Sequence, residues 1–460
     1  MYKIDFKHPC HVYFMGIGGI SMSGFAELLH SIGFTISGSD SKESKITKHL
    51  ETIGINIIYG QRAENITKNI DLVVFTAAIS ENNPEFMAAK ELGIPMISRA
   101  EMVGQVMKNY ETPIAISGTH GKTTTTSMVS HIFLAAEKDP TISVGGILKA
   151  IDGNLRIGKS GNFITEACEY TNSFLSFFPK ISVILNIEED HMDFFKDIND
   201  IRASFTKFAH RLPEDGTLII NGEIDNHEEI TKDLTCKVIT YGFDREKDYF
   251  AADNIEFDKD GFGSYDLYIN NTFKKRIQLS VVGRHNISNS MAALAVAYTT
   301  GIPIETAEEG LAEFRGTDRR FQLKGKREGV TIIDDYAHHP TEIKATLQAA
   351  KRYPANSIWC VFQPHTYTRT KAFLPEFAET LSLADHVVLT DIYAAREVDP
   401  GDISSRNILE LLKEKGTDAY YFSSFSEIEN FLLENCTNGD LLITMGAGDV
   451  VSIGESLLNK

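Results

Sequence analysis

The sequence predicts an α/β protein of three domains built mainly on parallel sheets. Strand-like apolar segments alternate with helix-like segments over most of the chain, which is the pattern of parallel α/β architecture. Two glycine-rich turns each follow a strand-like segment and precede a helix-like one. The length of 460 residues accommodates three domains at roughly 150 residues each, and each of them is long enough to bury its own core.

The first domain is expected over residues 1–110. Its strand candidates are the apolar segments 11–15, 34–37, 71–75 and 95–97, and its helix candidates are segments 20–32 and 99–108. The polar segment 109–112 marks the first boundary and is a candidate hinge.

The second domain is expected over residues 111–318, with strand candidates at 113–117, 162–166, 181–187 and 217–220. Between residues 248 and 282 the pattern becomes β-rich, with a turn signal at Asp260-Gly261. Helices that start at Asn289 and Glu305 are expected to close the domain near Phe314, and segment 315–320 is a second candidate hinge.

The third domain is expected over residues 319–460, where strands and helices alternate again. Its strand candidates are segments 330–334, 357–362, 386–390 and 440–444. The chain contains no internal repeat or low-complexity tract that would indicate a different architecture.

Composition narrows the class of function. A net charge of −18 disfavours a nucleic-acid partner, because phosphate backbones are bound by clustered Lys and Arg. The polar start gives no sign of a targeting peptide, and no apolar run is long enough to span a bilayer, so we expect a cytoplasmic protein without membrane insertion. The five cysteines are scattered and never form a C-x-x-C pattern, which suits a reducing compartment and disfavours a zinc site.

The strongest single motif is a short phosphate loop between a strand candidate and a helix candidate. Glycines in such a loop let backbone N–H groups approach phosphate oxygens, and the helix N-terminus adds positive potential. The lysine can reach the β and γ phosphates, and the hydroxyl that follows it can bind Mg²⁺. The alternative is a turn that only joins the strand to the helix. The loop consists of Gly118, Thr119, His120, Gly121, Lys122, Thr123 and Thr124.

A glycine cluster at the start of the first domain also follows a strand and precedes a helix. It lacks the third glycine of a dinucleotide fingerprint, because Ser21 occupies that position. The functional interpretation is a substrate diphosphate at a helix N-terminus, with polar residues after the second strand near its ribose; the alternative is a tight turn. The candidate substrate-binding residues here are Gly16, Gly18, Gly19, Ser39 and Asp40.

Two acidic segments follow strand candidates of the second domain, one at Glu166 and Glu169 and the other at residues 188–193, which include His191. Strand ends of an α/β sheet converge on the ligand crevice, and Mg²⁺ commonly bridges carboxylates to substrate phosphates. Beside a phosphate loop they predict a metal site, although either segment alone could be a surface loop.

Seven motifs in order resemble those of the Mur ligase family. They cover nearly the whole chain, and they are the glycine cluster, the phosphate loop, Asn186…Asp190-His191-Met192-Asp193, Gly283-Arg284-His285-Asn286…Asn289, Asp318-Arg319-Arg320-Phe321, Asp334-Asp335-Tyr336-Ala337-His338-His339-Pro340 and Gln363-Pro364-His365…Tyr367-Thr368-Arg369.

This resemblance implies a Rossmann-like UDP-sugar-binding domain, a central ATPase domain with a mixed sheet, and a Rossmann-like C-terminal domain that binds the amino acid. The implied substrates are UDP-N-acetylmuramate and L-alanine, joined in peptidoglycan biosynthesis by an enzyme that is a monomer or a weak homodimer. ATP, with Mg²⁺, would phosphorylate the sugar carboxylate, and the amine would attack the acyl phosphate.

The resemblance also implies roles for individual residues. Lys122 would neutralise the transferring phosphoryl group, Thr123 and Glu166 would hold one Mg²⁺, and His191 would hold another. The adenine would meet Asn286 and Asn289, and the rest of the nucleotide would meet Arg320 and Asp335. The amino-acid side would comprise Tyr336, His338, His365 and Arg369, with Arg369 as the partner of the L-alanine carboxylate.

Departures and alternatives stay open at this point. Cys168-Glu169-Tyr170 differs from the family's usual run, which leaves open whether Glu169 helps to hold metal, and Gln61 stands where a histidine is expected. His338-His339 before Pro340 could cap a helix. Other possible functions are a ligase that adds a preformed peptide during wall recycling, an NAD-dependent oxidoreductase, and a regulatory P-loop ATPase.

Overall fold

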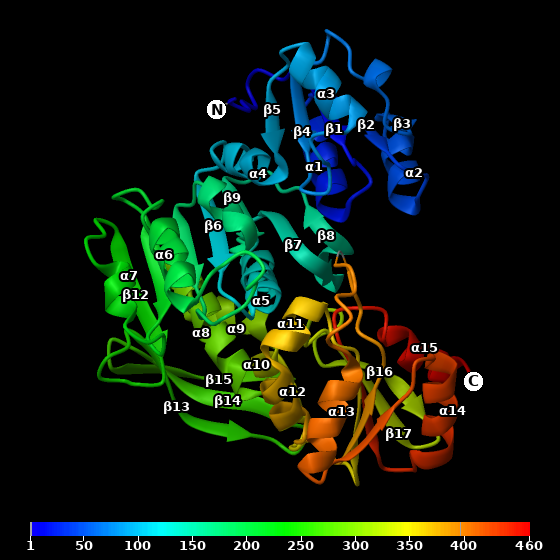
Figure 1. Cartoon of the computed structure of the whole chain (residues 1–460). Coiled ribbons are helices and arrows are strands. Elements are labelled where there is room, and N and C mark those ends of the chain that lie inside the picture. The colour runs from blue at the N-terminus through cyan, green and yellow to red at the C-terminus, as the bar shows by residue number, and fades with distance from the viewer. Residues whose placement is uncertain (1, 396) are drawn as a thin grey trace.

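The computed structural model describes residues 2–395 and 397–460. Three sheets follow one another along the chain, each covered by its own helices, and Figure 1 shows them as three successive bodies coloured blue, cyan to green, and yellow to red. The predicted α/β class is therefore confirmed.

The first sheet is wholly parallel and has the order β3-β2-β1-β4-β5, which is that of a Rossmann-type unit. Glycines after the first strand let the chain turn into α1, the first helix. The elements are β1 (His11–Met15), α1 (Ile20–Ser31), β2 (Thr35–Asp40), α2 (Lys45–Thr52), β3 (Asn56–Tyr59), η1 (Ala63–Asn65), β4 (Leu72–Phe75), α3 (Pro84–Glu91), β5 (Met96–Ser98) and α4 (Arg99–Met107).

The central sheet has ten strands in the order β15-β14-β13-β12-β11-β10-β6-β9-β7-β8, parallel in the middle and antiparallel at both edges. Its strands are β6 (Thr112–Ser117), β7 (Thr141–Leu148), β8 (Gly153–Arg156), β9 (Asn162–Glu166), β10 (Ile181–Ile184), β11 (Thr217–Asn221), β12 (Lys237–Gly242), β13 (Phe250–Phe257), β14 (Phe262–Ile269) and β15 (Thr272–Val282). Its helices are α5 (Lys122–Ala135), η2 (Lys149–Ile151), η3 (Tyr170–Ser176), α6 (Ile198–Ala209), α7 (His227–Thr231), α8 (Arg284–Thr299) and α9 (Ile304–Glu313).

Two predicted boundaries in this domain were wrong. The helix expected from Asn289 begins five residues earlier, at Arg284, because Gly283 with φ 94° turns the chain directly into it. The strand expected over 181–187 ends at Ile184, after which the chain bends toward the phosphate loop and the Leu185 amide bonds the Ser117 carbonyl.

The third sheet has the order β16-β17-β21-β18-β19-β20 and is parallel except for its edge strand β16. Its strands are β16 (Gln322–Arg327), β17 (Val330–Asp335), β18 (Ile358–Phe362), β19 (His386–Leu389), β20 (Asp418–Tyr421) and β21 (Leu441–Met445). Its helices are α10 (Pro340–Ala350), α11 (Tyr367–Ala372), α12 (Leu374–Leu381), α13 (Ser405–Glu414), α14 (Phe425–Asn435) and α15 (Val451–Asn459).

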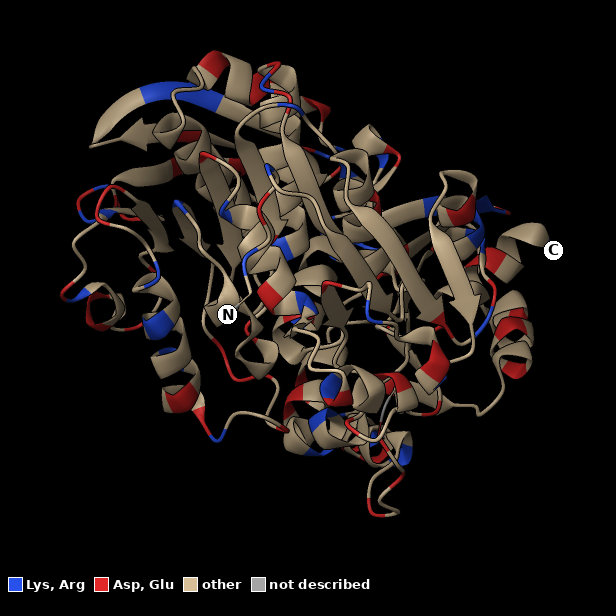
Figure 2. Cartoon of the chain, turned by 90° about the horizontal axis from the view of Figure 1, so that it is seen from above, with Lys and Arg blue, Asp and Glu red and all other residues tan. Residues whose placement is uncertain are grey.

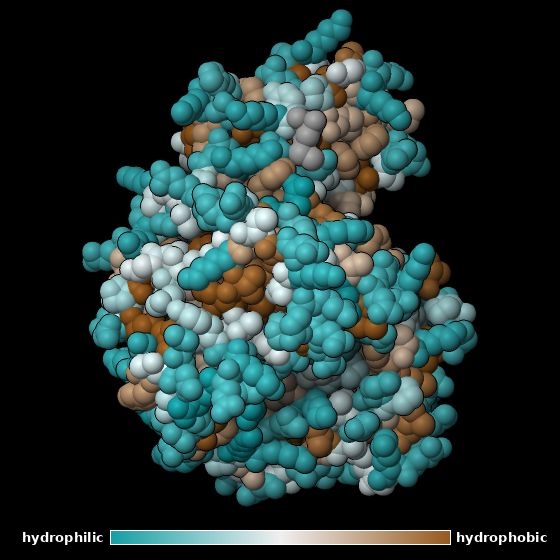
Figure 3. All heavy atoms as spheres, turned by 90° about the vertical axis from the view of Figure 1, so that its left-hand side faces the viewer, coloured by the Kyte–Doolittle hydropathy of each residue, from teal (hydrophilic) through white to brown (hydrophobic). Residues whose placement is uncertain are grey.

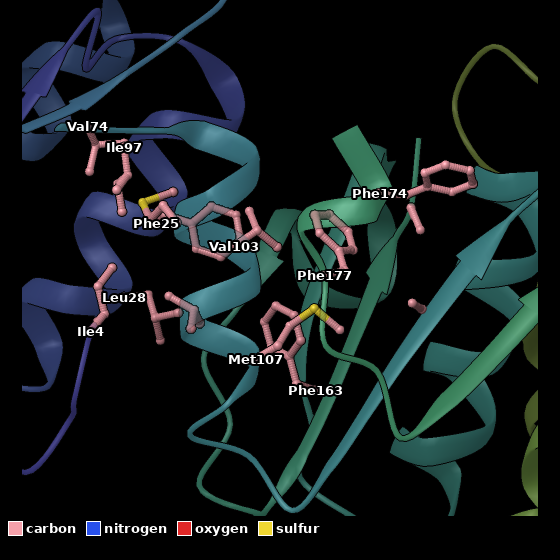
Figure 4. Packing of buried hydrophobic residues seen from close by; sticks show 14 of the residues in the cluster. Ile4, Phe25, Leu28, Val74, Ile97, Val103, Met107, Phe163, Phe174 and Phe177 are labelled. Carbon is pink, nitrogen blue, oxygen red and sulfur yellow. The ribbon is translucent and has the colours of Figure 1, made fainter. Parts of the chain in front are cut away.

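Helix α4 joins the first domain to the central one through a shared apolar core. Figure 4 shows Val103 and Met107 of this helix between first-domain side chains such as Phe25 and central-domain side chains such as Phe163. At Gly104 an added Cβ would lie 1.9 Å from the Ser176 carbonyl oxygen, so only glycine lets the helix approach η3 this closely.

Segment 109–112, the first candidate hinge, is anchored rather than loose. The Asn109 amide group donates to the Ile4 carbonyl at 3.0 Å and accepts from the Phe6 amide at 3.1 Å, and Tyr110 packs on Phe163. Strand β6 begins at Thr112. The segment therefore belongs to the packed junction between the two domains.

The surface agrees with the acidic composition. Figure 2 shows acidic and basic residues interspersed along the outer helices and loops. On the face in Figure 3, hydrophilic residues surround separate hydrophobic areas. No helix in the described part of the chain is long and apolar enough to cross a membrane.

Candidate active site

The phosphate loop connects β6 to α5 at the centre of the large sheet. Gly118 and Gly121 have φ of 141° and 84°, conformations that favour glycine. An Asn186 side chain fixes the loop by accepting from the His120 amide at 2.7 Å and donating to the His120 carbonyl at 3.1 Å. No side chain caps the start of α5, so its first amides remain available to phosphate oxygens.

Lys122 lies at the start of α5 and points back over the loop. Its Nζ is 3.0 Å from Glu169 Oε2 and donates to the carbonyls of Gly118 and Thr119. Burial alone would lower the pKa of Lys122, but the Glu169 carboxylate raises it well above its usual range, so the ammonium keeps its charge. The lysine predicted to meet phosphate is thus held by a carboxylate and two carbonyl oxygens.

Glu166 ends β9 beside the loop. Its Oε2 accepts from the Thr123 hydroxyl at 3.1 Å, and its Oε1 accepts from the Gly145 amide at 2.5 Å. Burial raises the pKa of Glu166, and these two hydrogen bonds oppose the rise. A partly buried carboxylate next to a hydroxyl is an oxygen-donor set of the kind that Mg²⁺ prefers.

His191 lies on the other side of Glu169. Its Nε2 is 3.7 Å from Glu169 Oε1, and its ring packs on Tyr170 with centroids 4.5 Å apart. Burial lowers the pKa of His191, which favours the neutral imidazole that a metal ion requires. The structure therefore brings Lys122, Glu166, Glu169 and His191 together, as the strand-end argument predicted.

Asp190 of the central domain forms an ion pair with the C-terminal domain. Its Oδ1 accepts from Arg369 Nη2 at 2.8 Å and from Nε at 3.2 Å, and both side chains are nearly buried. Burial alone would raise the pKa of Asp190, but the Arg369 guanidinium holds it far below its usual range. The arginine predicted to bind an amino-acid carboxylate is paired with a carboxylate of the central domain.

Of the other residues predicted on the amino-acid side, His365 contacts Arg369 and His338 contacts His365, whereas the Tyr336 ring lies against Arg319 and Arg320. His365 Nδ1 lies 3.1 Å from Arg369 Nη1, and the His365 ring packs edge-on against His338. His338 Nδ1 lies 3.0 Å from the Tyr336 carbonyl oxygen. Burial lowers the pKa of His338 to about 3, so the ring is neutral near pH 7.

The helix-cap alternative applies to the neighbouring histidine. His339 is the N-cap of α10, and its Nδ1 accepts from the Thr341 amide at 3.3 Å. Its Nε2 contacts the Glu189 carbonyl oxygen at 2.9 Å, so this capping residue also joins the C-terminal domain to the central one.

A cavity of about 960 Å³ lies between the phosphate loop, α8 and the start of the C-terminal domain. Asn286 and Asn289 sit near the start of α8 on its wall, where the Asn289 amide donates to Asn286 Oδ1 at 3.1 Å. Arg320 and Asp335 line it from the domain junction. Burial raises the pKa of Asp335 to about 6, although Arg320 opposes this.

Comparison with known proteins decides the family. Three Mur ligase descriptions match the chain in order: "Mur ligase family, catalytic domain" over residues 11–111, "Mur ligase middle domain" over 116–297 and "Mur ligase, glutamate ligase domain" over 319–448. The chain belongs to the Mur ligase family.

Relatives within the family cover the whole chain. A UDP-N-acetylmuramate–L-alanine ligase of Agathobacter rectalis is 62% identical over 460 residues, and one of Lachnoclostridium phytofermentans is 59% identical over 469, each covering 100% of both chains. The solved UDP-N-acetylmuramate-alanine ligase of Thermotoga maritima is 29% identical, with a TM-score of 0.80 and 98% of each chain covered. The α/β fold with three domains is thus that of Mur ligases.

The N-terminal glycine cluster of this Mur ligase forms the predicted turn before a helix. Gly16 (φ 78°) makes the turn, and no side chain caps α1 at Gly19. Asp40 accepts from the Gly18 amide at 2.8 Å, so it holds the loop. Ser39 is fully buried and its hydroxyl donates to Glu85, so this side chain is already engaged within the first domain, and its part in substrate binding stays a prediction.

Gln61 stands where a histidine was expected. Its Oε1 accepts a hydrogen bond at 2.6 Å from Asn83 of the same domain. The NAD-dependent alternative is excluded by membership of the Mur ligase family. Glu169, whose part in holding metal the sequence left open, lies 3.0 Å from Lys122 Nζ and 3.7 Å from His191 Nε2.

Sequence reasoning missed Glu342, which lies in the first turn of α10. Its carboxylate lies 3.2 Å from His120 Nδ1, 3.5 Å from Arg320 Nη1 and 3.2 Å from His338 Nδ1. The available signal was an acidic residue two positions after a proline at a helix start, within a motif that was interpreted only for its histidines.

Proposed function

We propose that this Mur ligase joins L-alanine to the carboxylate of UDP-N-acetylmuramate, using ATP and passing through an acyl phosphate. The observation that carries the proposal is the continuous set of ionisable groups from Lys122 through Glu169 and His191 to Asp190 and Arg369. This set connects the phosphate loop to the residues expected on the amino-acid side. The close relatives with this activity, cited above, support the choice of substrates.

The first half-reaction transfers the γ-phosphoryl group from ATP to the sugar carboxylate, and ADP leaves. Phosphoryl transfer depends mainly on positioning and on stabilising charge. The Lys122 ammonium, which keeps its charge, and the uncapped amides of α5 are suited to the transferring oxygens. The nucleotide base would occupy the cavity beside Asn286 and Asn289.

Magnesium fits the donors beside the loop. Thr123 and Glu166 would hold one ion, and the neutral His191 with Glu169 would hold another. Bound Mg²⁺ would stabilise the negative charge of the phosphate oxygens. The contacts of Thr123 with Glu166 and of Lys122 with Glu169 hold both carboxylates beside the loop.

In the second half-reaction the amine of L-alanine attacks the acyl carbon, and inorganic phosphate leaves as the amide bond forms. Arg369 presents a guanidinium that can bind the amino-acid carboxylate in a bidentate manner. The contact of Arg369 with His365, and of His365 with His338, supports an acceptor site on the C-terminal side of the cleft.

The test is ADP release with UDP-N-acetylmuramate and a panel of amino acids, with hydroxylamine added in parallel. We expect turnover with L-alanine and a hydroxamate that appears only when both ATP and the sugar carboxylate are present. Turnover with a preformed wall peptide in place of L-alanine would assign the chain to peptide recycling. ATP hydrolysis without hydroxamate would indicate an ATPase.

Such a reaction belongs in the cytoplasm, where ATP and nucleotide sugars are present, and this localisation is part of the proposal. The expectation of a monomer or weak homodimer stays a prediction, which sedimentation at micromolar concentration would check.

A further inference from the structure

The first turn of α10 forms a charged contact with the phosphate loop that the proposed mechanism does not use. Glu342 is nearly buried, and its Oε1 lies 3.2 Å from His120 Nδ1, in the variable position of the loop. The same oxygen lies 3.5 Å from Arg320 Nη1, on the wall of the nucleotide cavity. Its Oε2 accepts from the His338 amide at 3.1 Å.

The three partners of Glu342 come from three parts of the site. His120 belongs to the central domain, Arg320 to the junction, and His338 to the side expected to bind the amino acid. Burial alone would raise the pKa of Glu342, but these partners hold it well below its usual range, so the carboxylate is ionised. A single buried charge therefore connects the phosphate loop, the nucleotide cavity and the acceptor side.

Neighbouring contacts show that the start of α10 docks as a unit. Thr341 donates to Glu188 Oε2 at 2.5 Å, and His339 contacts the Glu189 carbonyl oxygen at 2.9 Å. Figure 1 shows α10 beside α8, which it contacts. Glu342 reaches the phosphate loop through an ion pair with His120, and the His339 ring packs on the same His120 ring with centroids 4.7 Å apart.

His120, Glu188 and His339 also lie close enough to share a metal ion, with candidate ligand atoms within 4.8 Å of one another. Both nitrogens of His339 already have hydrogen-bond partners. Burial alone would lower the pKa of His120, but Glu188 and Glu342 raise it to about 9. A protonated His120 between two carboxylates is an ion-pair bridge and not a metal ligand.

We propose that Glu342 is a positioning residue, which holds the phosphate loop through His120, and the nucleotide wall through Arg320, in the geometry set by the docked C-terminal domain. It acts through these side chains and is not itself a reacting group. The inference rests on the proposed function for the reaction, but its effect on nucleotide binding is independent of the acceptor.

The experiment is a double-mutant cycle on the full-length protein with Glu342→Gln, His120→Gln and the combination of the two. ADP affinity is measured by calorimetry, which needs no turnover, and kcat/KM for ATP is measured by ADP release. Losing a charge-assisted contact is expected to weaken ADP binding about tenfold to a hundredfold. The matched control is Glu379→Gln, which removes the same charge from an exposed site on α12.

If Glu342 acts through His120, the effect of Glu342→Gln on ADP affinity shrinks about fivefold or more in the His120→Gln background. The KM for the nucleotide sugar stays unchanged, because the first domain makes none of these contacts. Glu342→Asp keeps the charge on a shorter side chain and is expected to restore part of the affinity.

Equal effects of Glu342→Gln in both backgrounds overturn the proposal, as does an equal loss of affinity for ADP and for the nucleotide sugar. If Glu342→Gln does not fold, Glu342→Asp replaces it in the cycle under the same criteria. A wild-type protein that binds ADP with the expected coupling but forms no amide would refute the proposed function and leave this inference standing.

Discussion

The ion pair between Asp190 and Arg369 joins the central and C-terminal domains, and removing one partner should cost a large amount of stability. The two side chains are only 7% and 9% exposed, and the guanidinium reaches Oδ1 through two nitrogens at 2.8 and 3.2 Å. Truncating one partner of a buried pair costs about 3–5 kcal/mol, because the other charge stays buried without compensation. Arg369→Ala is therefore expected to lower the unfolding midpoint by roughly 10 °C for a unit of this size.

The pH dependence gives this prediction a sign. In the wild type Arg369 holds the pKa of Asp190 low, so the stability that the pair contributes is fully present above the unfolded value of 3.8 and is lost as pH falls through the lower folded pKa. Between pH 5 and 7 the pair therefore does not make the free energy of unfolding depend on pH. In Arg369→Ala the burial of Asp190 dominates and raises its pKa, so this variant should become more stable as pH falls from 7 to 5.

The assay is thermal unfolding of the full-length protein at several pH values, followed by circular dichroism and by calorimetry. Asp190→Asn combined with Arg369→Ala should recover part of the loss, because the buried charge is gone. Arg406→Ala, which removes an exposed guanidinium from the face of Tyr421, is the control. A midpoint for Arg369→Ala within 1–2 °C of wild type and equally flat with pH would refute the reasoning about this pair.

Three further predictions concern single positions. Lys122→Ala should lower kcat by about a thousandfold or more, since a methyl group cannot counter phosphoryl charge; ADP release at saturating substrates measures this, and residual activity above a few per cent would contradict it. Glu166→Ala should raise the Mg²⁺ concentration for half-maximal activity about tenfold, measured by metal titration after chelation, whereas an unchanged requirement would remove Glu166 from the metal site. Gly104→Ala should destabilise the protein by about 3 kcal/mol or more, because the new Cβ meets the Ser176 carbonyl oxygen; chemical unfolding tests this, and a neutral result would mean that α4 can shift.

Local chemistry explains which parts of the site were predictable. The phosphate loop was predictable because its glycines, lysine and threonine lie within one short segment between a strand and a helix. Glu166 and His191 were predictable because strands end at one edge of a parallel sheet. Each of these inferences needed only residues within one segment and the general geometry of α/β sheets.

Contacts between domains could not be predicted from the sequence in this way. Asp190 and Arg369 are 179 positions apart, and no local pattern assigns one to the other. Asp40, predicted near a ribose, lies at the end of β2 and accepts from the Gly18 amide, a contact that its position in the sequence does not reveal. The start of α8 was missed because Arg284 and His285 are polar and exposed, so the first turn of the helix has no apolar pattern.

The pairs at the site share a physical cause that bears on how ligands bind. Lys122 and Arg369, two of the cations expected to meet anionic substrates, each hold a carboxylate of the central domain. A buried cation without a partner is costly, and in a protein of net charge −18 carboxylates are plentiful. A phosphate or amino-acid carboxylate must therefore displace, or share a cation with, Glu169 or Asp190 on binding. The free energy gained in this exchange is only the difference between the new ionic contact and the old one. The affinity for an anionic ligand should therefore depend strongly on what stabilises the released carboxylate. Mg²⁺ near Glu169 would do so, which makes tight nucleotide binding without metal the least expected behaviour of this site.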